Sequence, residues 1–281
     1  MALVDRIRDV VPLDFSRVRP LRVDGDIVAW LPHATAETLR AFDEVFAVTQ
    51  EEVRLRGSLI GFEARSVAID RVVRALHDMG IVENYRNERY AIATSFHADP
   101  KFAIDRGAVG RLGMRAYGVH LNGYVGRGDD MRLWVARRAD DKPTWPGKLD
   151  HIAAGGQPIG IGLRDNLIKE AREEAGIPGS LASRARPAGL CSFLTENRYG
   201  IDIGILFSFD LELPADFVPE SEDGEVSSFE LWPMARVMDC LANSTDFVFD
   251  SALVVIDFLV RHGFVAPDDP DYLEIGAGLR R

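Results

Sequence analysis

The chain has 281 residues, and its 47% hydrophobic and 27% charged fractions are typical of a folded protein with one large domain or two ordinary ones. Its formal net charge of -11 argues against a protein that works on nucleic acid, because non-specific affinity for phosphate backbones comes from basic surface. Small phosphorylated molecules remain open as ligands if a bound metal ion reverses the charge locally.

Residues 1–114 are expected to form a smaller α+β domain. Asp24-Gly25 suits a tight type I′ turn, so the apolar stretches on its two sides predict a β-hairpin. Helical periodicity and apolar runs predict the remaining elements, namely helices at 3–11, 35–46, 64–79 and 104–112 and a strand at 88–94.

Residues 115–281 are expected to form a second domain, in which strands lie both before and after a central helix. This order is consistent with a mixed sheet covered by helices, and therefore with the α/β class. The predicted elements are strands at 116–125, 131–139, 186–195, 201–212 and 225–232 and helices at 163–175 and 247–262.

The cysteines and the N-terminal residues suggest where the protein works. Cys191 and Cys240 lie in apolar surroundings without CxxC spacing, which is typical of free thiols in a reducing compartment. The first residues lack the apolar core of a signal peptide, and no apolar run approaches the ~18 residues that span a bilayer. We therefore expect a cytoplasmic protein, monomeric or homodimeric, without nucleic-acid or membrane partners.

Negative charge is concentrated in the segment GGQPIGIGLRDNLIKEAREEAGI, residues 155–177. Glu170, Glu173 and Glu174 lie at offsets of zero, three and four, which places all three on one helix face. A solvated face would explain them equally well, because an exposed like-charge pair costs only about 0.2–0.5 kcal/mol. The glycine stretch fits neither GxxxxGK[ST] nor GxGxxG, since Asp165 stands at the third glycine position of the latter.

A third pattern does fit, because KEAREEAGI (169–177) resembles the REUxEExGU half of the Nudix box, and the opening glycine of the box then falls on Gly155. The resemblance implies a Nudix α/β/α sandwich with a mixed sheet, and a hydrolase that cleaves diphosphate linkages. Two positions depart from the box, Ile161 in place of glutamate and Lys169 in place of arginine. In the family these two residues pair and brace the loop against the helix, so the departure concerns the geometry of the loop.

The resemblance also assigns roles to individual residues. It implies that Gly155, through its carbonyl, and Glu170, Glu173 and Glu174 hold Mg²⁺, or alternatively Mn²⁺, by oxygen ligands of the kind these ions prefer. Glu173 and Glu174 are catalytic candidates as well. Glu225, in the later loop SEDGEVSSFELW, is the candidate general base, although a solvated loop acid is an equally simple interpretation.

The implied substrate is thiamine diphosphate or its oxo and oxy analogues. YGVHLNGYV (117–125) and LDHIAAGG (149–156), with Trp134 and Pro146-Gly147, resemble a Nudix subgroup related to the Nudix-like part of fungal thiamine pyrophosphokinases and to plant thiamine-diphosphate-type Nudix hydrolases. Nucleotides, nucleotide sugars and isoprenoid diphosphates remain alternative substrates. A Nudix-fold module that senses a diphosphate without cleaving it is the alternative from another functional class.

Candidate substrate contacts are weaker predictions, because each of these residues has an ordinary structural role as its alternative. Aromatic rings can hold a cationic heterocycle by cation–π contact, and Trp145 and Tyr124 are available for it. The tract YRNERY (85–90) could place Arg86 or Arg89 near the pocket, and residues 1–114 are expected to shape that pocket. The candidate substrate-binding residues are Trp134, His120, Asn122, His151 and Arg198.

Overall fold

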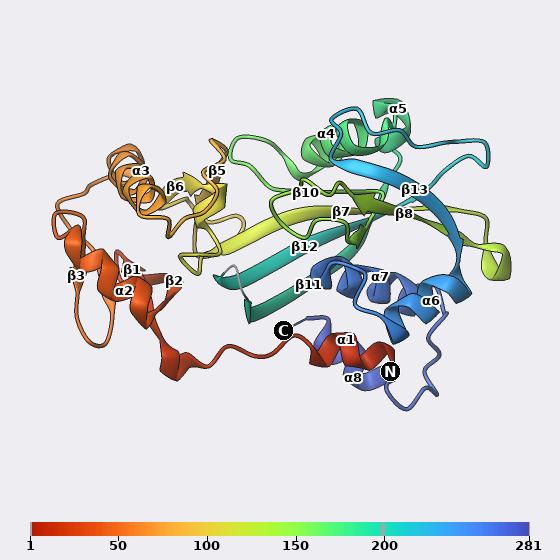
Figure 1. Ribbon diagram of the computed structural model, residues 1–281, viewed down its shortest axis with the longest axis horizontal. Helices are drawn as coiled ribbons and strands as arrows, with labels where there is room; N and C mark the ends of the chain where they lie inside the picture. Colours follow the sequence, from red (N-terminus) through yellow and green to blue (C-terminus); the bar gives the residue numbers. More distant parts are fainter. Residues whose placement is uncertain (1, 198–199, 281) are drawn as a thin grey trace.

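A mixed sheet forms the centre of the molecule in the computed structural model, which describes residues 2–197 and 200–280 (Figure 1). Within these residues its strands run in the order β11-β12-β7-β8-β13, while β10 pairs with β7 and β9 with β8. β12 and β7 are parallel and the other pairs are antiparallel. The strands are β7 (Arg115–Val125), β8 (Arg132–Arg138), β9 (Leu149–Asp150), β10 (Ala153–Gly156), β11 (Arg186–Asn197), β12 (Gly200–Glu212) and β13 (Val226–Pro233).

Helices cover both faces of this sheet. On one face lie α4 (Leu163–Ala175) and α5 (Gly179–Ala182), and on the other lie α6 (Met234–Asn243), α7 (Phe249–Arg261) and α8 (Tyr272–Gly278), as Figure 1 shows. Each face has its own apolar core, one around Leu167 and Ala171 and one around Phe258 and Leu259. The predicted α/β/α sandwich is confirmed. In the described part of the chain, no helix combines the length and the apolar character that crossing a membrane requires.

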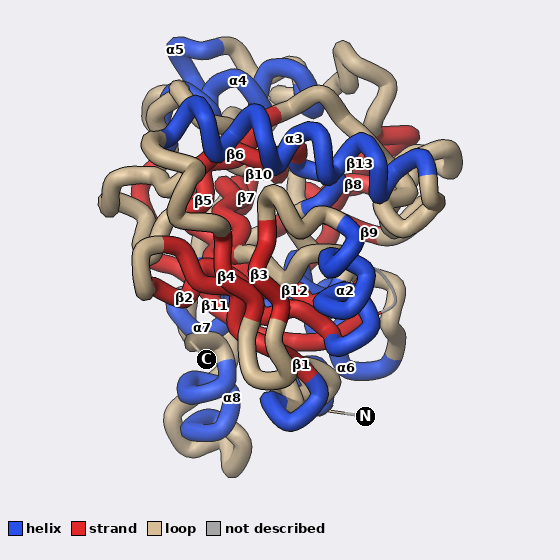
Figure 2. Tube along the Cα trace, turned by 90° about the vertical axis from the view of Figure 1, so that its left-hand side faces the viewer, coloured by secondary structure: helices blue, strands red, loops and turns tan. Residues whose placement is uncertain are grey.

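The N-terminal part lies at one end of the large sheet and has its own four-stranded sheet, ordered β2-β1-β4-β3 (Figure 2). The predicted hairpin is confirmed, with Asp24 and Gly25 at positive φ of 53° and 89° in the turn. A smaller pair, β5 with β6, lies beside helix α3. The elements are β1 (Val18–Val23), β2 (Asp26–Pro32), α2 (His33–Thr38), β3 (Phe46–Val48), β4 (Val53–Leu55), α3 (Phe62–Asp78), β5 (Arg89–Ile92) and β6 (Phe102–Asp105).

The first helix does not pack with the rest of the N-terminal part. Helix α1 (Leu3–Arg8) places Val4 and Ile7 in the same core as α6 and α7, and Arg8 forms a bidentate ion pair of 2.8 and 2.6 Å with Glu274 of α8. Figure 1 shows α1 and α8 side by side near the two termini. The range 1–114 is therefore not one packing unit, although β7 begins at the expected boundary.

Two predicted helices are wrong in part. The helix expected at 35–46 ends as a short 3-10 turn at Leu39–Ala41, and the chain then enters β3. The helix expected at 104–112 is instead the end of β6, followed by a 3-10 turn, η3 (Arg106–Ala108). Asp105 favours this local structure, because its carboxylate accepts the backbone N–H of Gly107 at 2.8 Å and caps the turn.

Candidate active site

Helix α4 is fixed to the sheet by its apolar stripe and by its two glycine ends. Gly162 is the extended residue before its first turn, and Gly176 ends it in the left-handed conformation at φ 62°. Ile177 is buried and donates its N–H to the carbonyl of Ala171 at 3.0 Å, which completes a Schellman-type end. This anchoring holds the acidic face of α4 against the glycine strand β10.

The three glutamates of α4 occupy different environments. Glu174 is 8% exposed and accepts the N–H of Ala154 at 2.8 Å, and burial raises the pKa of its carboxyl to about 8. The side chain of Glu170 is 13% exposed, and burial raises its pKa as well. A Cβ added to Gly155 would overlap the carboxyl group of Glu170, so a larger residue fits there only if the Glu170 side chain moves. Glu173 is 43% exposed and lies at the edge of the group.

A positive charge already lies among these carboxylates. The ammonium of Lys169 is 3.0 Å from a carboxylate oxygen of Glu170 and 3.1 Å from one of Glu173. Among the residues that the structure describes, no three His, Cys, Asp or Glu side chains are arranged around a common metal position. The donor set nevertheless fits a hard divalent cation, because it consists of carboxylate oxygens beside the backbone carbonyls of β10.

Two amide side chains brace the glycine loop in place of the ion pair that Ile161 and Lys169 cannot form. Asn166 of α4 is fully buried and donates to the carbonyl of Gly156 at 2.9 Å and to the side chain of Gln157 at 3.2 Å. Gln157 in turn donates to the carbonyl of Ile161 at 2.6 Å. The loop is thus tied to the helix by hydrogen bonds, a function that the sequence motif alone did not assign to these residues.

The loop that carries Glu225 lies at the end of α4. The backbone N–H groups of Glu222 and Asp223 both donate to the carbonyl of Glu173, at 2.9 and 3.3 Å. Glu225 is exposed and forms an ion pair with Lys142, whose side chain is 15% exposed. The structure therefore brings the candidate base to the helix that carries the candidate metal ligands.

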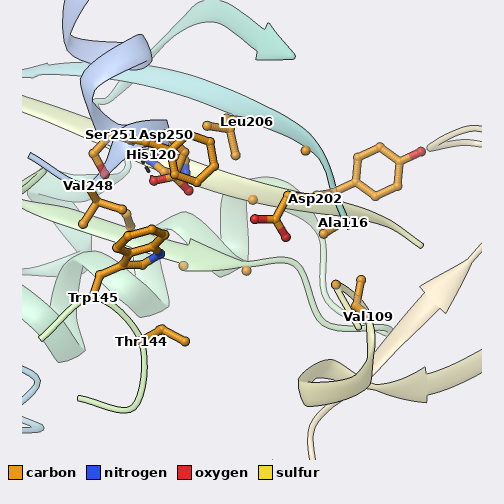
Figure 3. Close-up of a pocket in the computed structure, with 18 of the residues that line it drawn as sticks. Val109, Ala116, His120, Thr144, Trp145, Asp202, Leu206, Val248, Asp250 and Ser251 are labelled. Carbon is orange, nitrogen blue, oxygen red and sulfur yellow. Dashed lines mark hydrogen bonds between the residues drawn. The ribbon is translucent and has the colours of Figure 1, made fainter. Parts of the chain in front are cut away.

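A cavity of about 290 Å³ begins at β10 and extends between the N-terminal part and the sheet. Trp145 approaches it from the loop after β8, and Asp202 points its carboxylate into it from β12, as Figure 3 shows. Five aromatic side chains line it, which are Tyr90, Tyr117, Trp145, Phe193 and Phe249. Such a wall suits a flat organic group.

The cavity also has an acidic wall. Burial raises the pKa of Asp202 to about 6 and also raises that of Asp250. Asp150 is buried as well, which acts to raise its pKa, but the Arg138 guanidinium at 2.8 Å, together with smaller contributions from neighbours such as Ser251, holds the pKa of Asp150 below its usual range. Arg138 also donates to the carbonyls of Thr144 and Trp145 at 3.0 and 3.1 Å, which fixes the loop that carries the tryptophan. Of the cavity carboxylates in the described residues, Asp202 and Asp250 form no ion pair, although Asp202 accepts a hydrogen bond from the Asn197 side chain.

The five predicted substrate residues have different locations. His120 lines the cavity, and in the described structure its Nδ1 atom has no hydrogen-bond partner. His151 packs edge-on behind it, with 5.0 Å between ring centroids. Asn122 is buried and donates to Asp210 at 3.0 Å, and Trp134 lies in the core beneath α4, so neither lines the cavity. Arg198 lies outside the described residues.

Most lining residues of the cavity were not among the predicted contacts. Those that bear most on its chemistry are Tyr90, Arg106, Asp202 and Asp250. They lie on four separate segments, and only the folded chain brings them together. A signal for Tyr90 was present in YRNERY, where the prediction chose the neighbouring arginines instead.

Comparison with known proteins identifies the family. Nudix hydrolase 24, chloroplastic, from Arabidopsis thaliana is 41% identical over 263 residues, which cover 93% of this chain and 72% of that protein. Nudix hydrolase 20, chloroplastic, from the same plant is 40% identical over 270 residues, with the same coverage of 93% and 72%. The chain belongs to the Nudix hydrolase family.

This Nudix hydrolase is therefore an enzyme that acts on acid anhydrides in phosphorus-containing compounds, and such enzymes generally use divalent metal ions. Its residues 3–116 match a family described as a domain of unknown function, DUF4743. A solved NUDIX domain, that of Shewanella oneidensis NrtR complexed with ADP ribose, is 12% identical with a TM-score of 0.40, and the match covers 52% of this chain and 88% of that chain.

The comparison contradicts the cytoplasmic location predicted from the sequence, because both plant relatives are chloroplastic by name. The prediction depended on the lack of an apolar signal core and on the two free thiols. Targeting to plastids instead depends on a transit peptide, which is rich in Ser and Arg and poor in acidic residues. Neither the missing signal core nor the free thiols carry information about a transit peptide.

Proposed function

We propose that this Nudix hydrolase cleaves the diphosphate of a small molecule whose organic part is a heterocycle of the thiamine type, positively charged in thiamine and its oxy analogue and neutral in the oxo analogue. Thiamine diphosphate and its oxo and oxy analogues are the proposed substrates, and the products are a monophosphate ester and phosphate. The observation that carries the proposal is the cavity beside Gly155, which combines aromatic walls with the unpaired carboxylates of Asp202 and Asp250.

The proposed metal site is formed by Glu170, Glu173, Glu174 and the carbonyl of Gly155, with magnesium as the ion and manganese as an alternative. Such an ion would neutralise the phosphate oxygens and lower the pKa of a water molecule. Glu225 accepts the proton from the attacking water, because its loop is tied to the end of α4. Its ion pair with Lys142 holds the carboxylate in place.

The size and charge of the cavity support a heterocycle of the thiamine type over a dinucleotide. A volume of about 290 Å³ lies just below the ~300–1,000 Å³ range of ligand pockets, which favours a small organic group such as the two linked rings of thiamine over a dinucleotide. A cation among aromatic rings gains about 0.5–2 kcal/mol, and two carboxylates that lack a partner cation favour it further. The neutral rings of a nucleotide sugar gain no such attraction from these carboxylates.

A substrate panel tests this proposal. We expect kcat/KM with magnesium to be on the order of 100-fold higher for thiamine diphosphate or its oxo and oxy analogues than for ADP-ribose, ATP or dimethylallyl diphosphate. Preference for a nucleotide would retain the hydrolase and refute the proposed substrate. Equal rates across the panel would show that the cavity does not select the organic part.

The Asp202→Asn variant is expected to lose activity and gain stability. Removal of the charge should lower kcat/KM for a cationic substrate by about tenfold, while a neutral analogue changes little. The folded pKa of about 6 lies above the ordinary value of 3.8, so at pH 8 the folded state bears the cost of a buried charge. The variant should therefore be more stable at pH 8 by about 1–3 kcal/mol, and this gain should vanish as the pH falls from 6 toward 4.

Denaturant unfolding at pH 8 and pH 4, together with kinetics on one cationic and one neutral substrate, measures both effects. Asp216→Asn is the matched control, because Asp216 is an exposed acid in the loop after β12. An Asp202→Asn enzyme that kept its preference for the cationic substrate would refute the role of Asp202.

A further inference from the structure

The N-terminal part, whose family has no known function, contributes directly to the active-site cavity. Tyr90, Arg106 and Met114 from this part line the cavity together with the glycine strand β10. A Cβ added to Gly156 would overlap the Tyr90 hydroxyl, so the ring is packed against the backbone of that strand. The backbone N–H of Ile159 donates to the carbonyl of Arg89 at 2.9 Å. The two parts are therefore fitted to each other at the site where the diphosphate would lie.

The position of Arg106 is fixed by its backbone. Its N–H donates to the carbonyl of Glu88 at 2.8 Å, and the next residue, Gly107, packs so closely on Asn84 that a Cβ there would overlap the Asn84 carbonyl oxygen. The side chain is nevertheless 49% exposed and faces the cavity. One guanidinium nitrogen is 2.9 Å from Glu88, and within the described residues the other two have no hydrogen-bond partner.

Arg86 lies next to Arg106. Its backbone N–H donates to Asp105 at 3.0 Å, and its side chain shares with Arg106 a hollow of about 170 Å³. This hollow adjoins the main cavity, since both are lined by Arg106, Thr144 and Asp202. Within residues 2–197 and 200–280, no carboxylate forms an ion pair with Arg86.

The acidic groups around this pair form no ion pair with Arg86. Glu83 is paired with Arg111 at 2.9 Å, and both oxygens of Asp105 accept backbone N–H groups of the loop. Asp202 also lines the hollow, but in the described residues it is ion-paired with neither arginine, and burial raises its pKa to about 6. Burial and the positive charge of Arg106 both lower the pKa of Arg86. Two neighbouring guanidinium groups in a protein of net charge -11 thus have free donors that point toward a shared hollow.

We infer that Arg86 and Arg106 form an anion-binding site that holds phosphate oxygens of the substrate, and that the N-terminal part thereby completes the active site. The inference rests on the proposed diphosphate chemistry of the cavity. Guanidinium groups suit this role because they can donate two parallel hydrogen bonds to one phosphate. An anion between the two arginines also removes their mutual repulsion. The metal carboxylates and these arginines would then contact the diphosphate from the two parts of the chain.

The test is calorimetric titration of the full chain with inorganic diphosphate, first in chelator and then in magnesium. We expect Arg106→Gln to weaken binding about tenfold or more in both buffers, Arg86→Gln to weaken it several-fold, and Arg106→Lys to fall between Arg106→Gln and the wild type. Arg71→Gln is the matched control, because Arg71 is exposed on α3 and lines neither hollow; its affinity should equal that of the wild type.

Circular dichroism of each variant excludes unfolding as the cause, and Arg106→Lys provides a second variant with the charge retained. Wild-type-like affinity in Arg106→Gln, or no diphosphate binding by the wild type in either buffer, overturns the inference. The readout does not depend on hydrolysis. If no thiamine-type compound is cleaved but the arginine variants lose diphosphate affinity, the proposed substrate fails and the anion site stands.

Discussion

Replacing Glu174 with glutamine is expected to lower kcat/KM by on the order of 10²–10⁴-fold, because the proposed metal site loses its most buried carboxylate. Glutamine keeps the volume of the side chain, and its amide oxygen can still accept the N–H of Ala154. The backbone of β10 and α4 should therefore remain as it is. The change tests the charge of Glu174 with little effect on packing.

Steady-state kinetics in saturating magnesium measures the loss, and titration with Mn²⁺ followed by electron paramagnetic resonance measures metal affinity directly. Glu220→Gln is the matched control, because Glu220 is an exposed glutamate in the loop that returns to the same helix. If Glu174→Gln kept both its rate and its affinity for the metal, the carboxylates of α4 would not be the metal site.

Gly155→Ala is expected to reduce activity about 100-fold while the protein keeps most of its stability. The new Cβ overlaps the carboxyl end of Glu170, a flexible side chain, rather than a neighbouring backbone. Rotation of the Glu170 carboxylate away from the site would remove this overlap with the least disturbance, and it would also remove a proposed metal ligand. Overpacking that forces backbone shifts costs about 1–3 kcal/mol, and the expected loss of stability lies below that range.

Gly162→Ala provides an internal comparison within the same glycine stretch. Its Cβ would be 3.5 Å from Asp165, an ordinary contact, and the backbone at Gly162 has a φ of -74° that alanine adopts freely. We expect wild-type kinetics and a net stability change below about 1 kcal/mol, because the stiffer unfolded chain stabilises the variant while alanine is a poorer N-cap of α4 than glycine. Equal activity of both variants would show that the contact between Gly155 and Glu170 has no role in the reaction.

The elements with strong local signals were predicted well. The acidic helix was expected at 163–175 and has those bounds, because an extended glycine precedes it and a left-handed glycine ends it. The strands around it were also placed within a few residues. The short strand β10, with the sequence AAGG, was missed because it has no β-branched or aromatic residue and pairs only through the backbone of β7.

The site was predictable where its chemistry lies on one helix, and not where the fold assembles it. The spacing of Glu170, Glu173 and Glu174 is a local pattern, so their common helix face followed from helix geometry. Their unequal burial did not, because it depends on the contact of α4 with β10. Trp134, an aromatic residue within a strand, was predicted to contact the substrate but lies in the core.

The cavity could not be predicted because its chemistry comes from distant segments. Asp202 and Asp250 lie on β12 and α7, while Tyr90 and Arg106 lie in the N-terminal part. No spacing rule connects such positions. The hydrogen bonds of Gln157 and Asn166 could not be predicted for a different reason. Amide side chains are uncharged, so they leave no charge pattern in the sequence, and which groups they bond depends on what is buried around them.

The most direct test of the proposed function follows the ³¹P NMR spectrum of thiamine diphosphate during incubation with the full chain. We expect that in magnesium the two diphosphate resonances are replaced by those of a monophosphate ester and inorganic phosphate, and that excess chelator stops the conversion. Conversion that continued in chelator would contradict the metal site. Diphosphate resonances that stayed unchanged in magnesium would contradict thiamine diphosphate as the substrate.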